Sequence, residues 1–375
     1  MREIETGATL KIGVFFHGPK IFDEGFAERI IKSLKDLGEV QAAINGTMGI
    51  TACFDSFLEK EVQIEECKSS VCLSKLSEKN DLLVVVTYSK SPESGYAYCW
   101  HVIKRASVLD KPVIQIELSE MTLVPWTKNS GEIAKSFAKE LSLNVKDPPD
   151  FGKVLWREGE KIFRKVLAVS PGDYLLINNM TAGKAFSKDV TIVGLASAKG
   201  KIVEVRGVDL KDEASRKLDD MKIDVREAKL DTTKCLRDYE EARVLKVKEE
   251  VEGAGMAFVD HAGYDVYKIV KGCEGVVSIG DDTTTVVSDI AFRFDVPVIG
   301  IVDNDRDRIL PTVHVHKRSE LFIVEEDDEA GEKIFDEIFK RKKKIDIPFD
   351  DMKEKIAEIV EDVLIERVSM DLADF

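Results

Sequence analysis

Apolar runs of strand length alternate with helix-patterned segments along this chain, and that alternation restricts the fold more than any other feature. LKIGVFFHG (10–18) and DLLVVVTYSK (81–90) are nearly continuous apolar runs, as strands buried on both faces require. Each precedes a segment with helical spacing, at 23–38 and 95–109. Parallel strands joined by crossover helices produce this order. Residues 1–146 are therefore predicted to form a doubly wound, mostly parallel α/β unit.

A second stretch of the same kind lies in the carboxyl-terminal part of the chain. MAFVDHAGYD, GVVSIGDD, VPVIGIVDND and ELFIVEEDDEAG are typical of strands, with helical segments between them. We predict a second doubly wound, mostly parallel α/β unit over residues 213–375. Its tail, DDMKEKIAEIVEDVLIERV, is predicted to be an amphipathic helix.

The segment between the two α/β units has a different pattern. DPPDFG (147–152) is predicted to be a linker, because its two prolines cannot continue a helix. A helix is expected at about 153–167. After it, short β-branched runs and glycine turns at 172–210 indicate a small antiparallel β insert. Residues 153–212 are therefore predicted to be a helix plus a β insert.

Charge and hydropathy restrict the partners and the location. The net charge of −15 argues against a general nucleic-acid or membrane-surface role, because phosphate backbones attract basic surfaces. No apolar run approaches the roughly 18 residues of a membrane span, and the amino terminus has no apolar signal region. We expect a cytoplasmic protein with neither a nucleic-acid nor a membrane partner.

The stretch GDDTTT (280–285) stands where a strand ends and a helix begins. A glycine there lets a ligand approach the backbone, and the N–H groups of the first helical turn attract anions. The residues predicted to bind a phosphorylated ligand are Gly280, Asp281, Asp282, Thr283, Thr284 and Thr285. The alternative is that Asp282 or Thr283 only caps the helix.

A second acidic group follows the next strand, where PVIGIV ends in Asp303, Asn304 and Asp305. The carboxyl ends of adjacent parallel strands face the same crevice, so the acids after both strands are expected to converge. Unpaired carboxylates would repel one another unless a cation neutralises them. We therefore predict a Mg²⁺ ion held by Asp281, Asp303 and Asp305, with Asn304 as a further ligand contact.

The run GDDTTTVVSDIAFRFDVPVIGIVDND (280–305) is similar to the phosphofructokinase family, in which a glycine–aspartate–threonine turn cradles phosphates and a strand ends in Asp-Asn-Asp. It also resembles the corresponding turn of the NAD kinase family, although Ile279 stands where both families prefer a glycine. The resemblance implies phosphoryl transfer, with Asp303 as the catalytic base that activates the attacking hydroxyl.

Two other interpretations remain open. The pair Asp303 and Asp305 resembles the Asp-x-Asp of toprim domains, which implies a metal-dependent nucleic-acid enzyme, although Glu274 precedes its strand instead of following it. Alternatively, the protein is a non-enzymatic regulator or scaffold, in which the acids form a structural cation site.

The amino-terminal half has weaker signals. His17, in HGP at the end of a predicted strand, is a candidate base or phosphate contact. Gly46 and Thr47, in GTMG, suit a phosphate loop but lack the pattern of a P-loop. His314 and His316 alternate in TVHVH, so in a strand they would share a face and could give two metal ligands; the alternative is that they face solvent or make ordinary hydrogen bonds.

Across its length the chain resembles an uncharacterised archaeal family, seen chiefly in methanogens. The resemblance rests on HGPKIFDEGFAERIIKSL, NGTMGITACFDS and IGDDTTTVVSDIAFRFDVPVIGIVDND. It implies no particular activity.

Overall fold

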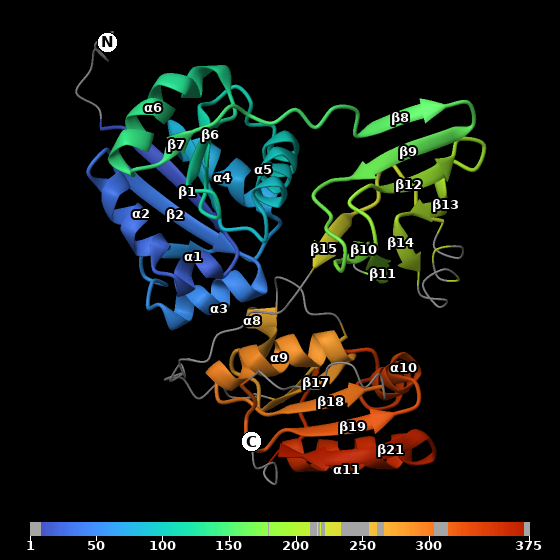
Figure 1. Ribbon diagram of the computed structural model, residues 1–375. Coiled ribbons are helices and arrows are strands. Elements are labelled where there is room, and N and C mark those ends of the chain that lie inside the picture. Colours follow the sequence, from blue (N-terminus) through green and yellow to red (C-terminus); the bar gives the residue numbers. More distant parts are fainter. Residues whose placement is uncertain are drawn as a thin grey trace. The chain divides into compact units, whose positions relative to one another are not determined.

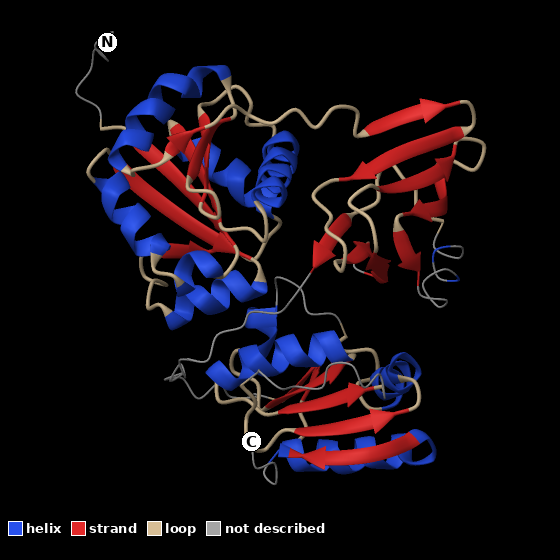
Figure 2. Cartoon of the chain, viewed as in Figure 1, coloured by secondary structure: helices blue, strands red, loops and turns tan. Residues whose placement is uncertain are grey.

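A computed structural model describes residues 9–178, 180–210, 216, 218, 222–233, 255–260, 266–303 and 314–370 (Figures 1 and 2). By the density of internal contacts, the chain divides into two compact units. Unit 1 comprises Met1–Ile21, Arg29–Gln41 and Leu73–Leu236, and unit 2 comprises Phe22–Glu28, Ala42–Cys72 and Arg237–Phe375. The α/β fold class is confirmed, with two mostly parallel sheets and antiparallel sheets between them in sequence.

Sheet A has seven strands in the order β3-β2-β1-β4-β5-β6-β7. Its strands are β1 (Lys11–His17), β2 (Glu39–Asn45), β3 (Val62–Ile64), β4 (Leu82–Thr87), β5 (Val113–Glu117), β6 (Thr122–Pro125) and β7 (Asn144–Val145). Its helices are α1 (Lys20–Asp23), α2 (Phe26–Lys35), α3 (Thr47–Asp55), α4 (Ser69–Lys79), α5 (Pro92–Ala106), η1 (Lys128–Ser130) and α6 (Gly131–Glu140).

The strand order of sheet A reverses between β1 and β4. These strands run parallel with His17 beside Thr87, and the chain leaves β1 toward β2 but leaves β4 toward β5. Such a reversal is the doubly wound arrangement expected from the sequence. Strand β4 is buried throughout, as its unbroken apolar run requires.

The two antiparallel sheets, which we call the antiparallel module, correct one prediction. The helix expected at about 153–167 is wrong, because β8 (Leu155–Glu158) and β9 (Lys161–Val166) form a hairpin there. Gly159 takes a positive φ of 58° at the turn. The buried Ile162 and Val166 follow the period of two that is typical of a strand.

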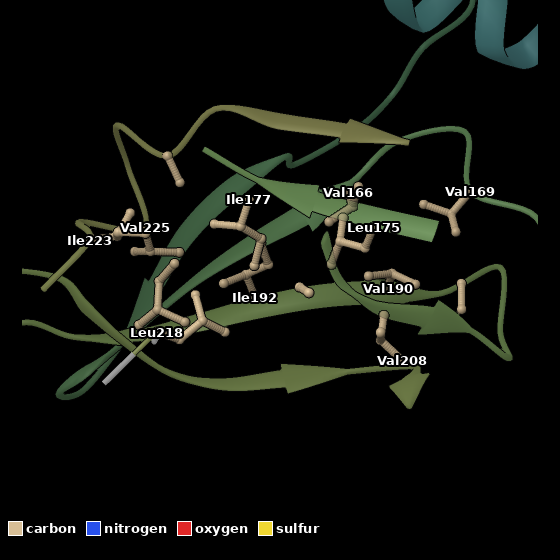
Figure 3. Close-up of a cluster of buried hydrophobic side chains, with 14 of the residues drawn as sticks. Val166, Val169, Leu175, Ile177, Val190, Ile192, Val208, Leu218, Ile223 and Val225 are labelled. Atoms are coloured by element: carbon tan, nitrogen blue, oxygen red, sulfur yellow. The ribbon is translucent and has the colours of Figure 1, made fainter. Parts of the chain in front are cut away.

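Two four-stranded sheets make up the module, in the orders β13-β12-β9-β8 and β14-β11-β10-β15. Their other strands are β10 (Tyr174–Ile177), β11 (Met180–Ala185), β12 (Val190–Leu195), β13 (Lys201–Arg206), β14 (Val208–Leu210) and β15 (Leu230–Thr233). Figure 3 shows their shared core, in which Leu175, Ile177, Ile192 and Val225 lie together. Strand β15 belongs to the module although it lies beyond residue 212, and the predicted domain boundaries stay predictions.

Sheet D has the order β20-β16-β17-β18-β19-β21. The four central strands, β16 (Met256–Val259), β17 (Gly275–Ile279), β18 (Val298–Val302) and β19 (Glu320–Val324), are parallel. The antiparallel edge strands are β20 (Lys344–Ile345) and β21 (Leu364–Ser369). The helices are α8 (Val266–Val270), α9 (Asp281–Arg293), α10 (Asp327–Glu337), α11 (Phe349–Val360) and η2 (Glu361–Val363).

Helices cover both faces of sheet D (Figure 1). Ile279 and Ile301 face α10 and α11, within a core that includes Ile334 and Ile356. The opposite face meets α9. The tail prediction was half right, since α11 is a helix but the LIERV segment forms β21 on the sheet edge.

Candidate functional site

The Gly280 turn joins β17 to α9. Gly280 has φ 89° and ψ 148°, a conformation suited to glycine, and α9 begins at Asp281. The N-cap residue is Gly280, which has no side chain to cap the helix. The capping role expected for Asp282 or Thr283 is therefore wrong, because both lie inside the first helical turn. The turn presents the first residues of a 13-residue helix at the carboxyl end of a parallel strand.

Two of the predicted ligand threonines hold the fold together. The Thr284 hydroxyl lies 2.8 Å from that of Ser278, and both residues are buried. A Cβ added to Gly300 would lie 2.5 Å from Thr284 Cγ2, so the glycine allows α9 to approach β18 closely. The Thr285 hydroxyl donates to the Asp281 carbonyl at 2.8 Å. Both hydroxyls are therefore engaged within the protein.

Thr283 occupies a different position. Its hydroxyl is 3.4 Å from the carbonyl oxygen of Asp260, the residue that follows β16. This bond links the ends of two adjacent parallel strands. Thr283 is thus the predicted ligand threonine that lies at the strand edge and is only partly buried.

Acidic residues follow each of the four parallel strands of sheet D. Asp260 follows β16, Asp281 follows the Gly280 turn, Asp303 follows β18, and Asp327 begins α10 after β19. A Cβ added to Gly280 would lie 3.8 Å from Asp327 Oδ2, which places that carboxylate beside the turn. Sequence reasoning overlooked Asp327, although VEEDDEA after an apolar strand was a usable signal.

Part of the predicted metal site cannot be placed. Asn304 and Asp305 lie outside the described residues, and only Asp281 and Asp303 of the predicted metal ligands lie within them. Among the residues that the structure describes, no group of three or more His, Cys, Asp or Glu side chains could hold a metal ion. The Mg²⁺ site therefore stays a prediction.

The Gly46 turn has the same local geometry as the Gly280 turn. Gly46 has φ 81° and ψ 136°, α3 begins at Thr47, and the N-cap residue is again a glycine, which has no capping side chain. The Thr51 hydroxyl donates to the Thr47 carbonyl at 2.8 Å, as Thr285 does to Asp281. Both turns carry the pattern G-x₄-T-x₃-D, which ends at Asp55 and at Asp289. Sequence reasoning overlooked this recurrence, which was visible in the letters.

One buried guanidinium binds both aspartates of that pattern, within unit 2. Arg293 Nη2 lies 2.8 Å from Asp55 Oδ2, and Arg293 Nη1 lies 3.0 Å from Asp289 Oδ2. The side chains of Arg293 and Asp55 are 1% and 3% exposed. Burial opposes the charge of Arg293, but its hydrogen bonds and two negative neighbours outweigh burial and raise its pKa.

The surroundings of Arg293 are also polar and aromatic. The Tyr267 hydroxyl hydrogen-bonds to the Thr51 hydroxyl, and burial raises the pKa of Tyr267. Burial also opposes ionisation of Asp289, but the bond from His314 and the charge of Arg293 prevail and lower its pKa. This cluster has the properties of a structural junction, because its groups bind one another.

The prediction that the two histidines of HVH share a face of a strand is wrong. Residues 314–316 are irregular and not a strand. His314 Nδ1 lies 3.4 Å from Asp289 Oδ1, and His316 Nε2 lies 3.2 Å from Asp295 Oδ1. Each histidine therefore serves a separate carboxylate on or after α9.

His17, the remaining predicted ligand residue, ends β1 in unit 1. Its ring stacks on that of Tyr98, with centroids 3.6 Å apart and planes 14° apart. The prediction that it lies at the carboxyl edge of its sheet is confirmed; its contact with a ligand stays a prediction.

The family and the relative that this chain matches are both described as uncharacterised. The family described as "Uncharacterized protein conserved in archaea (DUF2117)" matches residues 14–342. An uncharacterised protein of Methanocaldococcus jannaschii, MJ0065, is 37% identical over 334 residues, which cover 86% of this chain and 90% of that protein. No solved structure matches. Among the described residues, no helix is both long and apolar enough to cross a membrane.

Proposed function

This chain belongs to an archaeal family of uncharacterised proteins, DUF2117, and from the geometry of its C-terminal sheet we propose that it binds a phosphorylated small molecule or nucleotide together with Mg²⁺. The proposed reaction is phosphoryl transfer. The ligand would lie at the carboxyl edge of sheet D, which is where open α/β sheets commonly bind ligands.

The observation that carries this proposal is the Gly280 turn. The glycine puts no Cβ between the backbone and a ligand, and the N-cap position of α9 therefore carries no capping side chain. Such a terminus offers N–H donors and a partial positive charge to a phosphate group. Thr283, at the same edge, would add a hydroxyl donor by exchanging its 3.4 Å contact with the Asp260 carbonyl oxygen for a phosphate oxygen.

The acids at this edge make a cation part of the proposal. Asp281, Asp303 and Asp327 would repel a phosphate group, whereas Mg²⁺ bridges carboxylate and phosphate oxygens. Mg²⁺ commonly uses one or two protein carboxylates and takes its other ligands from water and phosphate. Two acids from different strands therefore suffice, with Asp281 and Asp303 as the proposed pair and Asp305 as a third candidate.

In the proposed transfer, Asp303 accepts the proton of the attacking hydroxyl group. The oxygen attacks the phosphorus atom, and the bond from phosphorus to the leaving oxygen breaks. Asn304 would orient the same substrate, and Mg²⁺ would neutralise the charge on the phosphate oxygens. Gly46 and Thr47, at the N-terminus of α3, are proposed as a further phosphate contact on the same physical grounds.

Calorimetric titration tests the binding step. We expect ATP or ADP, from a panel that includes sugar phosphates, to bind the full chain with Mg²⁺ and to lose binding in EDTA. Asp303→Asn should weaken Mg²⁺-dependent binding by about tenfold or more, the size expected for loss of one charged ligand. Asp362→Asn, an exposed acid just after α11, is the matched control and should leave binding unchanged.

Transfer is tested separately, with γ-labelled ATP and candidate acceptors. Binding that depends on Mg²⁺ and Asp303, without label transfer to any acceptor or to water, would favour the non-enzymatic regulator instead. If no member of the panel binds with Mg²⁺, both parts of the proposal fail.

A further inference from the structure

The antiparallel module has a hydrophobic core of its own and little close packing on sheet A. Ile177 and Ile192 are fully buried within that core. Among the described elements, no strand of the module runs close to a helix or strand of sheet A at more than isolated points. Residues 146–154, which join the two parts, form neither helix nor strand. Parts of a chain that share a small interface move relative to one another unless specific contacts hold them.

An ion pair joins the module to sheet A, and both partners lie in unit 1. Lys90 Nζ binds the carboxylate of Asp173, and it also donates to the Thr232 hydroxyl oxygen at 3.2 Å. Lys90 belongs to the loop between β4 and α5, whereas Asp173 directly precedes β10 and Thr232 lies in β15. The Asp173 side chain is fully buried, and the Lys90 side chain is 22% exposed. Loss of either partner would leave the other charge unpaired, so the pair holds the two parts together.

The loop that carries Lys90 is itself held by a buried carboxylate. Glu117 is fully buried, and its Oε1 accepts a hydrogen bond from the Ser89 N–H at 3.2 Å. Its Oε2 accepts from the hydroxyl of Thr87, the last residue of β4, at 2.6 Å. A Cβ on Gly95 would lie 1.7 Å from Glu117 Oε2, so only glycine permits this contact. These bonds fix the loop, and with it the backbone of Lys90, at the carboxyl edge of sheet A.

The Asp173 carboxylate is only partly satisfied in this arrangement. Its Oδ2 accepts the Ser170 N–H at 2.8 Å and also binds Lys90. Its Oδ1 is buried and has no hydrogen-bond partner among the described residues. A buried carboxylate oxygen without a partner costs free energy that contact with water would recover. Desolvation therefore opposes the attraction between Asp173 and Lys90, which allows the pair to separate without unfolding either part.

We propose that Lys90 and Asp173 form a releasable latch, which holds the antiparallel module to the carboxyl edge of sheet A. When the pair separates, the module moves away from that edge about residues 146–154. The strand order of sheet A reverses at this edge, where open α/β sheets commonly bind ligands. The latch thus links the position of the module to the loop at this edge. It is independent of the function proposed for sheet D.

Small-angle X-ray scattering from the full chain tests the latch. We expect Lys90→Met to increase the radius of gyration, because the module is no longer held to the loop. Asp173→Asn keeps an acceptor for the Ser170 N–H but removes the charge, and it should change the radius of gyration in the same direction. Lys135→Met is the matched control, because Lys135 forms an exposed pair with Glu132 on α6, and it should leave the radius unchanged.

The three tryptophans distinguish opening of the latch from loss of structure. Trp126 follows β6 in sheet A, and Trp156 lies in β8 of the module. Trp100, on α5, meets the joining segment at Phe151, with ring centroids 5.6 Å apart. In fluorine NMR of the full chain labelled with fluorotryptophan, Lys90→Met should shift or broaden the Trp100 signal and leave the other two unchanged. Substitution of each tryptophan by phenylalanine assigns the signals.

Four results would overturn the proposal. They are an unchanged radius of gyration in both Lys90→Met and Asp173→Asn, an equal increase in Lys135→Met, an unmoved Trp100 signal, and shifts of all three tryptophan signals. The last result would mean that the pair serves the folding of unit 1 and is not a latch. None of these variants changes a residue of the site proposed for sheet D, so failures of the two proposals are distinguishable.

Discussion

The Gly46 and Gly280 turns share a backbone but differ in charge. Each joins a parallel strand to a helix through an N-cap glycine, which has no capping side chain and has φ between 81° and 89°. After Gly46 the first turn reads Thr-Met-Gly, whereas after Gly280 it reads Asp-Asp-Thr. The neutral turn can meet an anion directly, but the acidic one needs a cation between itself and a phosphate group.

The residues that the two turns share make hydrogen bonds and ion pairs within the protein. In both, a threonine hydroxyl binds the carbonyl of the first helical residue, and an aspartate one turn later binds Arg293. The differing residues are those at the strand edge. This contrast assigns Thr51, Thr285, Asp55 and Asp289 to the fold, whereas the ligand roles of Asp281 and Thr283 stay predictions.

Arg293→Met should give the largest effect, because it removes the partner common to both helices. The substitution leaves Asp55 buried without its cation, which costs about 3–5 kcal/mol of unfolding free energy. Urea denaturation followed by circular dichroism measures the loss. The control is Arg341→Met, whose exposed pair with Asp336 should change stability by less than about 1 kcal/mol. Equal losses of stability in Arg293→Met and Arg341→Met would contradict the structural role of the buried Arg293 cluster.

Gly46→Ala and Gly280→Ala should lower the free energy of unfolding by amounts similar to each other. Neither added Cβ meets a close atom, since none lies within 4 Å at Gly46 and only Asp327 Oδ2 lies at 3.8 Å at Gly280. The cost is therefore backbone strain, about 1–3 kcal/mol at each site. Thermal unfolding of Gly46→Ala and Gly280→Ala tests this equality.

Gly131→Ala is the control for that pair. Gly131 has φ −62° and open space around its Cβ position, so alanine should stabilise the protein by about 0.4–1 kcal/mol. A loss at Gly131, or no loss at Gly46 and Gly280, would refute the strain argument.

Substitutions of Thr51 and Thr285 should affect stability to different extents. Thr285→Val loses one bond to a carbonyl, about 0.5–1.5 kcal/mol, whereas Thr51→Val also leaves the buried Tyr267 hydroxyl without this partner, which adds about 1–3 kcal/mol. Serine at either position keeps the hydroxyl and should recover most of the loss. Denaturant midpoints of the four variants would show whether Thr51 is the more sensitive position.

The sequence predicted both parallel sheets because their strands include unbroken apolar runs, such as LLVVV and VIGIV, that a strand buried on both faces explains. It failed at 153–167, where Ile162 and Val166 fit a helix as well as a strand, and Gly159 was not read as a turn. The edge strand β21 was likewise hidden in an amphipathic pattern, because its partner β19 is distant in sequence.

The candidate site was only partly predictable, for a related reason. Strand ends could be located from the letters, so Gly280 and Asp303 were found at the edge of sheet D. Which threonine hydroxyls face inward depends on packing across the sheet, as the contact of Thr284 with Gly300 illustrates. The identity of the N-cap residue of α9 was also missed. Gly280 holds that position because of its backbone conformation, and a glycine has no capping side chain that the sequence could show.

The smallest expected effect is a change in how the stability of the protein depends on pH, and it comes from Asp289. The folded-state pKa of Asp289 is lowered because the bond from His314 and the charge of Arg293 outweigh burial. Its contribution to stability is therefore fully present above the unfolded pKa of about 3.9, and it is lost as pH falls through the lower folded value. Asp289→Asn should reduce stability at neutral pH and flatten the dependence below about pH 4.

Asp362→Asn, which changes an exposed acid, should leave that pH dependence unaltered. Denaturation midpoints measured between about pH 7 and pH 2.5 would show the difference. A parallel offset between the original chain and Asp289→Asn at all pH values would mean that the carboxylate is not ionised by its partners in the fold. Convergence of the two curves in acid would instead place the charge of Asp289 in the junction that anchors α9 behind its acidic first turn.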